Sequence, residues 1–361
     1  SINMIIKPFC DKFSPEIVLG GIPMSIDARV VNLGDIELQS GCVLPNLKIS
    51  HKTFGTLNAT RSNAILMPTF YGGKHNDYEA IIGTDQALDP STYFIIAVDM
   101  MCNGLSSSPS NGDAPFSGPK FPKITHWDNV HAQQKMLEQE YGIETLALVT
   151  GFSMGGQQAN HWAAIFPDRV ERMISWCGSA ATAPHNWVFL EGVKAGLLAD
   201  PTFANGSYTD VPEVGIRAFA RIWAGWGPSQ AFYRHKLHQE LGQETAADHM
   251  QDFWESNFLA FDANDLLGMM HTWQVANISD NELYDGDFEA ACRAIKAKTI
   301  LMPCETDLYF PVADNEIQAS LMSNVELRPI PSDWGHIAGA PGLNPVDSAF
   351  IDKAHRELLA S

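Results

Sequence analysis

Short apolar segments alternate with helical patterns along most of the chain. Helical patterns such as 131–141 and 157–166 lie between several strand-like segments. The strand-like segments are rich in β-branched and aromatic residues, end at turn residues, and lie at 47–54, 64–70, 93–99, 145–150, 170–176, 298–304 and 325–330. Near-continuous apolar strands that alternate with helices are typical of a mostly parallel sheet with helices on both faces. The sequence therefore predicts an α/β fold.

The alternation stops between about residues 183 and 289, where the apolar stretches have helical periods and no convincing strand. These stretches are WVFLEGVKAGLL, VGIRAFARIWAGW, MQDFWESNFLAF and ANDLLGMMHTWQV. Strand-like sequence resumes at Lys298. We therefore expect one α/β core, formed by residues 1–182 and 295–361, that is interrupted by a helical lid at residues 183–294.

A serine is bracketed by two glycines in the segment GFSMG at residues 151–155. The strand-like stretch TLALVT comes directly before it, and the helix-like stretch QQANHWAAIF follows. This order is typical of a nucleophile elbow, a tight turn that exposes the serine hydroxyl at the carboxyl end of a strand. Glycines at the flanks let the backbone reverse without side-chain collisions. We predict that Ser153 is a nucleophile, the alternative being an ordinary glycine-rich turn.

A serine nucleophile needs a base that removes its proton and an acid that orients the base. With a nucleophile elbow, the acid and then the histidine follow the serine, each on the loop after a later strand. The loop after the strand-like segment KTILMP carries Glu305 and Asp307, and the next such loop carries Asp333 and His336. We predict Asp307 as the acid and His336 as the base. Glu305 is the alternative acid, and Asp333 is most simply a turn residue.

An oxyanion hole requires two backbone amides near the nucleophile. One comes from the residue after the serine, here Met154, and the other from the loop after an early strand. The stretch ILMPTFYGGKHND supplies that loop, and its paired glycines permit close backbone approach. Phe70 or Tyr71 would donate the second amide, and we assign Tyr71. The alternative is an ordinary glycine turn.

Metal and cofactor patterns are weak in this chain. His235 and His238, with Glu240 close by, have metal-like spacing, but the charged stretch RHKLHQE is more typical of a solvated helix face. Nothing resembles a phosphate-binding P-loop or the glycine pattern of dinucleotide sites. We therefore expect no bound metal and no bound cofactor.

Charge and cysteine usage narrow the class of protein. The formal net charge is −19, which disfavours nucleic-acid binding because that binding needs clustered Lys and Arg. The six cysteines are scattered without the dense spacing of a disulfide framework. The opening residues lack the pattern of a secretory signal, and no apolar run is long enough to span a bilayer. We expect a cytoplasmic protein that acts on a small-molecule substrate, away from nucleic acid and membranes.

The chain resembles the homoserine O-acetyltransferase family over nearly its whole length. The resemblance runs through LQSGCVLPNLKISHKTFGTLNATRSNAILM, QALDPSTYFIIAVD, GFSMGGQQANHWA, GSAATAPHNWVFLEGVKAGLLADPTF, LAFDANDLL, and the DLYFP and GH loops. It implies an α/β-hydrolase fold with a helical lid, and a catalytic serine, aspartate and histidine at Ser153, Asp307 and His336. It also implies acetyl transfer from acetyl-CoA to a hydroxyl through an acyl-serine, and a possible homodimer.

The acceptor site departs from the family pattern at two places. Family members that act on homoserine usually carry an aspartate directly after the catalytic histidine, whereas this chain has Ile337. The family arginine that meets the acceptor carboxylate matches Arg221, but the tyrosine expected about two turns later is replaced by GWGPS. A neutral branched side chain cannot pair with an ammonium group, so Arg221 and Ile337 would form a changed acceptor site.

The sequence-based interpretation is therefore an acyltransferase that moves an acyl group from acyl-CoA to a hydroxyl acceptor other than homoserine. One alternative is an esterase of small or hydrophobic esters, which shares the first half-reaction and then uses water. A second alternative is a non-catalytic ligand receptor on the same scaffold.

Overall fold

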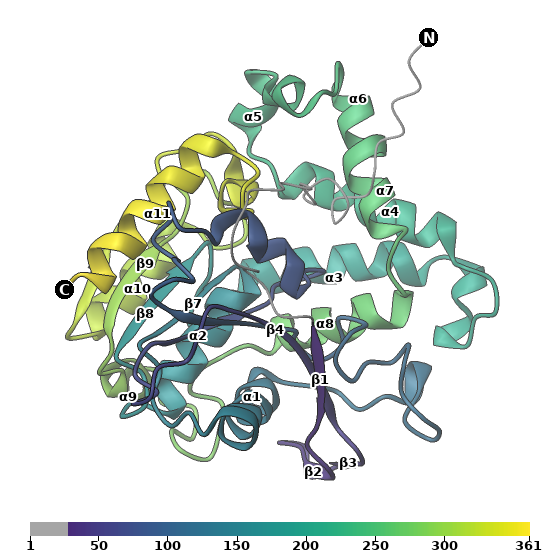
Figure 1. Cartoon of the computed structure of the whole chain (residues 1–361). Coiled ribbons are helices and arrows are strands. Elements are labelled where there is room, and N and C mark those ends of the chain that lie inside the picture. The colour runs from purple at the N-terminus through teal and green to yellow at the C-terminus, as the bar shows by residue number, and fades with distance from the viewer. Residues whose placement is uncertain (1–27) are drawn as a thin grey trace, which may run out of the picture.

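An eight-stranded sheet forms the centre of the molecule in the computed structural model, which describes residues 28–361 (Figure 1). Its order is β1-β4-β6-β5-β7-β8-β9-β10. The strands are β1 (Arg29–Asn32), β4 (Lys48–Phe54), β5 (Ala64–Pro68), β6 (Phe94–Val98), β7 (Leu148–Phe152), β8 (Arg172–Trp176), β9 (Lys298–Met302) and β10 (Val325–Leu327). Neighbours pair in parallel from β6 to β10, whereas β4 is antiparallel to β1 and β6.

Each of the seven predicted strand segments overlaps a strand of this sheet, although β7 extends two residues beyond its predicted segment 145–150. The central strands β5, β6 and β7 are buried along their whole length, which explains their continuous apolar sequence. β1 and a small separate sheet of β2 (Ile36–Glu37) and β3 (Val43–Leu44) were not predicted from the sequence. β1 has three exposed residues out of four, so it lacks the apolar run that identified the other strands.

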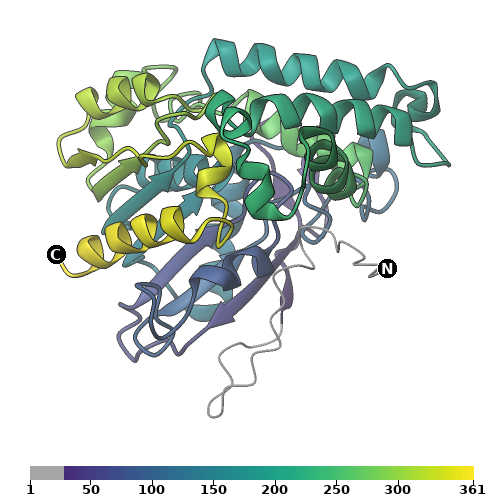
Figure 2. The ribbon, with the colours of Figure 1, turned by 90° about the horizontal axis from the view of Figure 1, so that it is seen from above.

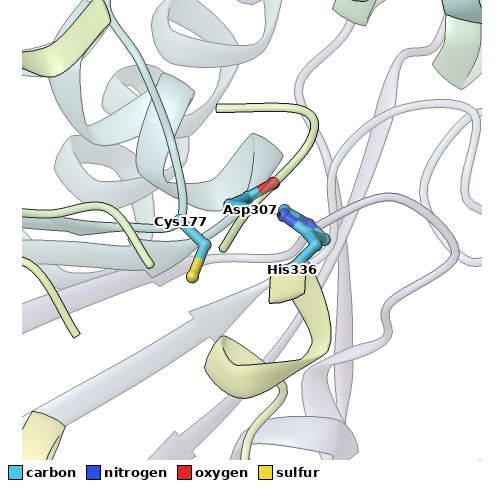
Figure 3. Close-up of side chains that lie close together, drawn as sticks. All are labelled: Cys177, Asp307 and His336. Carbon is cyan, nitrogen blue, oxygen red and sulfur yellow. Dashed lines mark hydrogen bonds and ion pairs between the residues drawn. The ribbon is translucent and has the colours of Figure 1, made fainter. Parts of the chain in front are cut away.

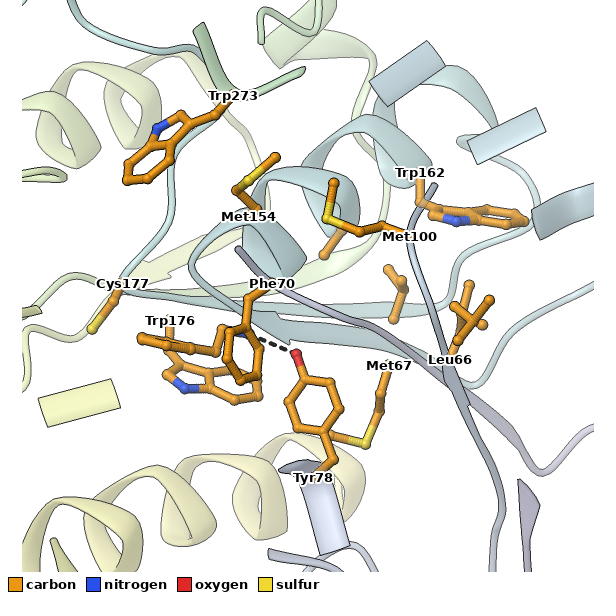
Figure 4. Packing of buried hydrophobic residues seen from close by; sticks show 14 of the residues in the cluster. Leu66, Met67, Phe70, Tyr78, Met100, Met154, Trp162, Trp176, Cys177 and Trp273 are labelled. Carbon is orange, nitrogen blue, oxygen red and sulfur yellow. Dashed lines mark hydrogen bonds between the residues drawn. The ribbon is translucent and has the colours of Figure 1, made fainter. Parts of the chain in front are cut away.

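Helices cover both faces of the sheet. On one face α1, α2, α9 and α10 contact one another in series, and on the other α11 packs against β8 and β9. Ile351 of α11 and Ile81 of the 3₁₀ helix η2 line the same small pocket. These elements are α1 (His126–Tyr141), α2 (Met154–Ile165), α9 (Phe288–Ala294), α10 (Val312–Leu321), α11 (Pro345–Leu359), η2 (His75–Ile81), η3 (Gly118–Lys120) and η7 (Gly335–Gly339). Figure 4 shows the two core layers, with Tyr78 and Trp176 on one side of the strands and Met100, Met154 and Trp162 on the other.

Local sequence sets the limits of α1, the longest of these helices. At its start, Thr125 Oγ1 accepts a hydrogen bond from the Asp128 amide, and Asp128 Oδ2 accepts one from the Thr125 amide. This reciprocal cap satisfies two amides that the helix itself leaves without partners. At its end, Gly142 has a φ of 61°, a left-handed conformation that glycine adopts without strain.

Most of the helices between β8 and β9 form a separate layer next to the sheet, and this layer runs along the upper edge of Figure 2. They are α3 (Pro184–Leu198), η4 (Pro201–Gly206), α4 (Glu213–Trp226), α5 (Gln230–Arg234), η5 (Leu237–Leu241), α6 (Ala246–Asp248), the π-helix η6 (His249–Glu255), α7 (Ser256–Phe258) and α8 (Ala263–Gln274). We call α3 to α8 the lid helices. α9 lies inside the predicted lid segment but contacts α2 and α10. The predicted domain limits at 182 and 295 stay a prediction.

The architecture is the predicted α/β-hydrolase fold with a mostly parallel sheet. Among the helices of residues 28–361, none combines the length and the apolar character needed to cross a membrane. The five cysteines in this range carry free thiols, while Cys10 and the rest of the opening segment lie outside the described residues.

Candidate active site

Ser153 lies on a sharp corner between β7 and α2. Its φ of 55° and ψ of −121° put it outside the conformations that side chains other than glycine normally adopt, which is the strain expected of a nucleophile elbow. The two flanking positions, Gly151 and Gly155, have no room for a side chain. A Cβ on Gly151 would lie 2.4 Å from the Gly155 carbonyl carbon, and one on Gly155 would lie 2.4 Å from the Pro68 carbonyl oxygen. The pattern G-x-S-x-G thus has a direct steric cause.

The structure brings Ser153, His336 and Asp307 into one hydrogen-bonded chain. Ser153 Oγ lies 2.9 Å from His336 Nε2, and His336 Nδ1 lies 2.8 Å from Asp307 Oδ2. The other Asp307 oxygen, Oδ1, accepts the amides of Tyr309 at 2.7 Å and Phe310 at 3.2 Å. A carboxylate held in this way fixes a proton on Nδ1 of the imidazole and leaves Nε2 free to accept the serine proton. The arrangement can therefore activate a serine hydroxyl.

Strand topology explains how three distant residues meet. Ser153 follows β7, Asp307 lies after β9, and His336 lies in η7 after β10. β7, β8, β9 and β10 are successive parallel neighbours, so their carboxyl ends share one edge of the sheet. All three side chains are buried: 2% of Ser153, 4% of Asp307 and 7% of His336 is exposed. Their hydrogen bonds therefore compete with little water.

The backbone of the histidine loop is tied to the lid helices. The His336 amide donates to the Gly227 carbonyl at 2.9 Å, just after α4. Gly335 has a φ of 70°, and a Cβ there would lie 2.5 Å from the Ser229 amide nitrogen. The sequence analysis did not identify this contact. The GH dipeptide after the last strand marks the loop, but nothing in the sequence shows what packs against it.

Aromatic rings surround the imidazole. The Tyr309 and Phe152 ring centroids lie 4.6 Å and 4.9 Å from that of His336. Burial raises the pKa of the Tyr309 hydroxyl well above its usual range, so this ring is neutral. A low-dielectric wall of this kind strengthens the carboxylate–imidazole interaction.

Candidate oxyanion amides lie on both sides of Ser153. Met154 is the first residue of α2, where the amides have no acceptor within the helix. Phe70 and Tyr71 line the same cavity as Ser153, and within residues 28–361 neither of their amides donates to a protein acceptor. The Tyr71 side chain points to the lid, where its hydroxyl donates to the Leu266 carbonyl at 2.8 Å. Both residues fit the role, and the choice between them stays a prediction.

A cavity of about 310 Å³ opens onto Ser153 and His336. Much of its wall is aromatic and comes from the lid helices and the α7–α8 connection: Trp223, Phe253, Trp254, Phe258, Phe261 and Trp273. Phe253 and Trp254 are consecutive residues of the π-helix η6, and both line the cavity. The sequence analysis missed these two residues, since helical periodicity does not reveal a π-helix.

Charge is sparse in this wall. Among the described residues that line the cavity, Lys74 is the one lysine or arginine, with Nζ 5.7 Å from the Phe261 ring centroid, and none is an aspartate or glutamate. Ile337 lines the cavity next to His336. Arg221 does not line it, because its Nε bonds to Glu255 Oε1 at 2.6 Å on the lid. The structure thus brings Ile337, but not Arg221, to the predicted substrate site.

Two groups of residues have metal-like composition. His235 Nδ1 lies 3.0 Å from Asp333 Oδ2, while His238 Nδ1 lies 2.9 Å from the Gln243 carbonyl, so the two rings have different partners.

The second group is Cys177, Asp307 and His336, whose ligand atoms lie within 4.8 Å of one another (Figure 3). Burial raises the pKa of the Cys177 thiol well above its usual range, and a metal needs the thiolate. Asp307 and His336 also bond to each other. This group therefore fits a proton relay better than a metal centre.

Comparison with known proteins gives one family. A family model described as the alpha/beta hydrolase fold matches residues 65–338. A protein of Corynebacterium glutamicum, named as a probable esterase, is 39% identical over 340 residues, covering 92% of this chain and 96% of its own length. An ethyl acetate hydrolase of Pseudomonas veronii is 38% identical over 339 residues, covering 92% and 95%. The crystal structure of an acetylester hydrolase from Corynebacterium glutamicum matches with a TM-score of 0.90 at 38% identity, covering 93% and 96%.

The resemblance to homoserine O-acetyltransferases is supported at a lower level. Such an enzyme of Acidiphilium cryptum is 30% identical over 363 residues, covering 88% of this chain and 93% of its own length. The proteins at 38–39% identity have esterase or hydrolase names instead. From the site geometry and these matches, we conclude that the chain belongs to the α/β-hydrolase fold family and is an enzyme of the hydrolase or acyltransferase type.

Proposed function

We propose that the protein is a serine esterase that hydrolyses small, uncharged esters through an acyl-serine intermediate. The observation that carries this proposal is the hydrogen-bonded chain of Ser153, His336 and Asp307 at the floor of an apolar cavity. The interpretation drawn from sequence put acyl transfer from acyl-CoA first and hydrolysis second. Relatives named as esterases at 38–39% identity favour the reverse order.

In the first half-reaction, Ser153 Oγ attacks the ester carbonyl while His336 Nε2 takes the serine proton. Asp307 stabilises the resulting imidazolium, and the amides of Met154 and of Tyr71 or Phe70 hold the negative oxygen. The tetrahedral intermediate collapses when His336 returns the proton to the leaving alcohol. In the second half-reaction His336 activates a water molecule, which attacks the acyl-serine and releases the acid.

The cavity wall supports a neutral, apolar substrate. Five aromatic side chains of the lid helices and Phe261, between α7 and α8, line the site, and none of the described residues that line it has a carboxylate to pair with an ammonium group. Ile337 occupies the position where enzymes acting on homoserine usually have an aspartate. A zwitterionic acceptor would lose its charge pairing on entering this wall, at a cost of several kcal/mol. Ethyl acetate, named for the Pseudomonas veronii relative, is a small neutral ester and so belongs to the class of substrate that we propose.

The test compares hydrolysis with transfer. Purified protein is given ethyl acetate or 4-nitrophenyl acetate, and separately acetyl-CoA with and without homoserine. We expect acid release from the esters with a kcat/KM of about 10⁴ M⁻¹s⁻¹ or more, and CoA release at least about 100-fold slower, with homoserine giving no acceleration. Homoserine-dependent CoA release as fast as ester hydrolysis would overturn the proposal. Ser153→Ala controls for background reaction.

Acyl transfer to a neutral alcohol is the second candidate, and the burial of the site favours it. Only 2% of Ser153 and 7% of His336 is exposed beneath the lid helices, which limits the access of water to an acyl-serine. Hydrolysing an ester in increasing concentrations of a neutral alcohol separates the two reactions. A product ratio that favours the new ester over the free acid at millimolar alcohol would support transfer.

A further inference from the structure

The loop between β5 and η2, residues 69–74, carries Phe70 and Tyr71, the two candidates for the second oxyanion amide. Its first residue is firmly held. The Thr69 amide donates to the Val98 carbonyl at 2.9 Å, and its own carbonyl accepts Gln158 Nε2 at 2.8 Å. Gln158 lies on α2, one turn after Ser153. The start of the loop is thus fixed relative to the serine, and the question is what fixes its other end.

A buried carboxylate anchors the end of the loop. Asp99, directly after β6, has no exposed surface and accepts three hydrogen bonds. Its Oδ2 lies 2.6 Å from His75 Nδ1, and its Oδ1 accepts the His75 amide at 2.9 Å and Asn103 Nδ2 at 2.9 Å. None of these three residues lines the cavity. A buried charge with three donors fixes the positions of all of them.

Asn103 extends this network into the loop. Its Nδ2 also donates to the Gly73 carbonyl at 3.1 Å, and the Gly73 amide donates to the Phe70 carbonyl at 2.8 Å. The space around Gly73 is tight, since a Cβ there would lie 2.8 Å from the Phe70 ring. A continuous set of contacts therefore runs from Asp99 through Asn103 and Gly73 to Phe70, whose carbonyl belongs to the peptide group that carries the Tyr71 amide.

We propose that Tyr71 supplies the second oxyanion amide and that Asp99, His75 and Asn103 are positioning residues that hold this amide of the 69–74 loop in place for the tetrahedral intermediate. This proposal rests on the acyl-serine chemistry proposed above. The three residues do not touch the substrate. They fix the peptide group between Phe70 and Tyr71, and an oxyanion amide stabilises the intermediate only when it is held at the correct distance and direction.

Positioning can be told from a merely structural role by what the variants change. Loosening the loop should weaken the transition state and leave ground-state binding to the aromatic wall intact, so kcat should fall while KM stays constant. A fluorophosphonate gives a second measure. Ser153 Oγ bonds to its phosphorus, fluoride leaves and His336 takes the proton, while the oxyanion amides hold the phosphoryl oxygen. The labelling rate therefore measures how well the loop holds the oxyanion amide, and it does so whether the enzyme hydrolyses esters or transfers acyl groups.

The main variant is Asn103→Ala, which breaks the link to Gly73 and keeps the Asp99–His75 pair. Losing an oxyanion donor outright costs about 10²–10³ in kcat, so a displaced one should cost about 10–100-fold in kcat and in the labelling rate. We expect KM to change by less than about 2-fold. His75→Asn, whose amide can replace the Nδ1 donor, should retain more of both rates than His75→Leu. The control is His355→Asn, because His355 is a buried histidine of α11 whose ring nitrogens both bond to partners outside the loop, Thr150 and Ile351.

The proposal is overturned if folded Asn103→Ala labels and turns over at the wild-type rate. It is also overturned if His355→Asn lowers both rates as much as Asn103→Ala does, since any buried polar loss would then have the same effect. Failure of the proposed function has a different signature, in which the wild-type protein is labelled at Ser153 but does not hydrolyse esters. If the wild type is labelled but hydrolyses no ester, the ratio of variant to wild-type labelling rates still measures the effect of each variant on the oxyanion amide of the loop.

Discussion

Ser153 Oγ lies 2.9 Å from His336 Nε2, although the two residues are 183 positions apart in the chain. Asp307 lies on the other side of the same imidazole. If this geometry carries the chemistry, the three side chains must act as one unit. Their removal should therefore be severe, and the losses should not add when two of them are removed together.

Ser153→Ala and Asp307→Asn test this unit. We expect Ser153→Ala to lower kcat by at least about 10⁴-fold, because the variant lacks the oxygen that would attack the ester carbonyl. Asp307→Asn should lower it by about 10⁴-fold, because an amide no longer fixes the tautomer of His336. Steady-state ester hydrolysis and thermal unfolding measure both effects. Ser320→Ala, an exposed serine on α10, is the control, and a loss below about tenfold for either triad variant would contradict the assignment.

Ile337→Asp tests the polarity of the cavity wall. A carboxylate beside His336 is costly to bury in an apolar site, and a neutral ester makes no ion pair that would offset this cost. We therefore expect kcat/KM for neutral esters to fall by about tenfold or more. An ester with a quaternary ammonium group, such as acetylcholine, should lose less or gain. Ile337→Asn separates charge from shape. Equal losses for neutral and cationic esters would show that the wall does not select by charge.

Arg221→Ala should change stability and leave substrate binding alone. Arg221 pairs with Glu255, which is buried and also bonds to Arg217 at 2.8 Å. Burial raises the pKa of Glu255, but the two guanidinium hydrogen bonds outweigh it and hold that pKa below its usual range. Because about half of Arg221 is exposed, its loss should cost no more than about 1 kcal/mol. A KM that rises about tenfold for a neutral ester would instead indicate substrate contact.

Gly155→Ala and Gly192→Ala should have opposite effects on stability. At Gly155 the new methyl group would meet the Pro68 carbonyl oxygen at 2.4 Å and the Tyr78 hydroxyl at 2.8 Å, so we expect a loss of about 1–3 kcal/mol or more. At Gly192, in α3, nothing lies within 4 Å, and alanine favours the helix by about 0.5–1 kcal/mol. Urea unfolding of both variants measures the pair. Equal effects at the two sites would contradict the steric account of the elbow.

His249 gives the lid a pH-dependent contribution to stability. Trp254 Nε1 donates to His249 Nε2 at 3.0 Å, and burial lowers the pKa of His249 from 6.5 to about 4. The unfolded chain therefore takes up this proton at a higher pH than the folded chain. The contribution is fully present above pH 6.5 and is lost as the pH falls toward 4, by at most about 1.4 kcal/mol per pH unit.

The measurement is urea unfolding of the wild type and of His249→Gln at about pH 7.5 and about pH 5. Glutamine cannot take up the proton, so the variant should lose less stability than the wild type over this interval. Parallel curves for the two proteins would rule out His249 as a source of the dependence.

The sequence was sufficient for the features that have local signals. The G-x-S-x-G elbow is written in consecutive residues because glycines at 151 and 155 are required by space. Strand order then predicted Asp307 and His336, since parallel strands place successive loops at one edge of the sheet. The buried strands β5, β6 and β7 also have a local signal, because a strand that is covered on both faces is a continuous apolar run.

Features that depend on packing between remote segments could not be predicted. Arg221 matched a family position, yet its partner Glu255 lies in a π-helix that no sequence period reveals. The network of Asp99, His75 and Asn103 joins two loops through side-chain angles that only the folded chain defines. The hydrogen bond from the His336 amide to the Gly227 carbonyl likewise depends on how the lid helices pack against the core.

After β8 the chain leaves the sheet to form the lid helices, and it returns through α9 to β9, the strand that pairs directly with β8. Because those two strands pair along their full length, the register of the sheet does not depend on the length of the excursion between them. The excursion nevertheless carries the Gly227 carbonyl that accepts the His336 amide. A transplanted segment 184–274 would therefore have to reproduce this contact in order to leave the reactive groups aligned.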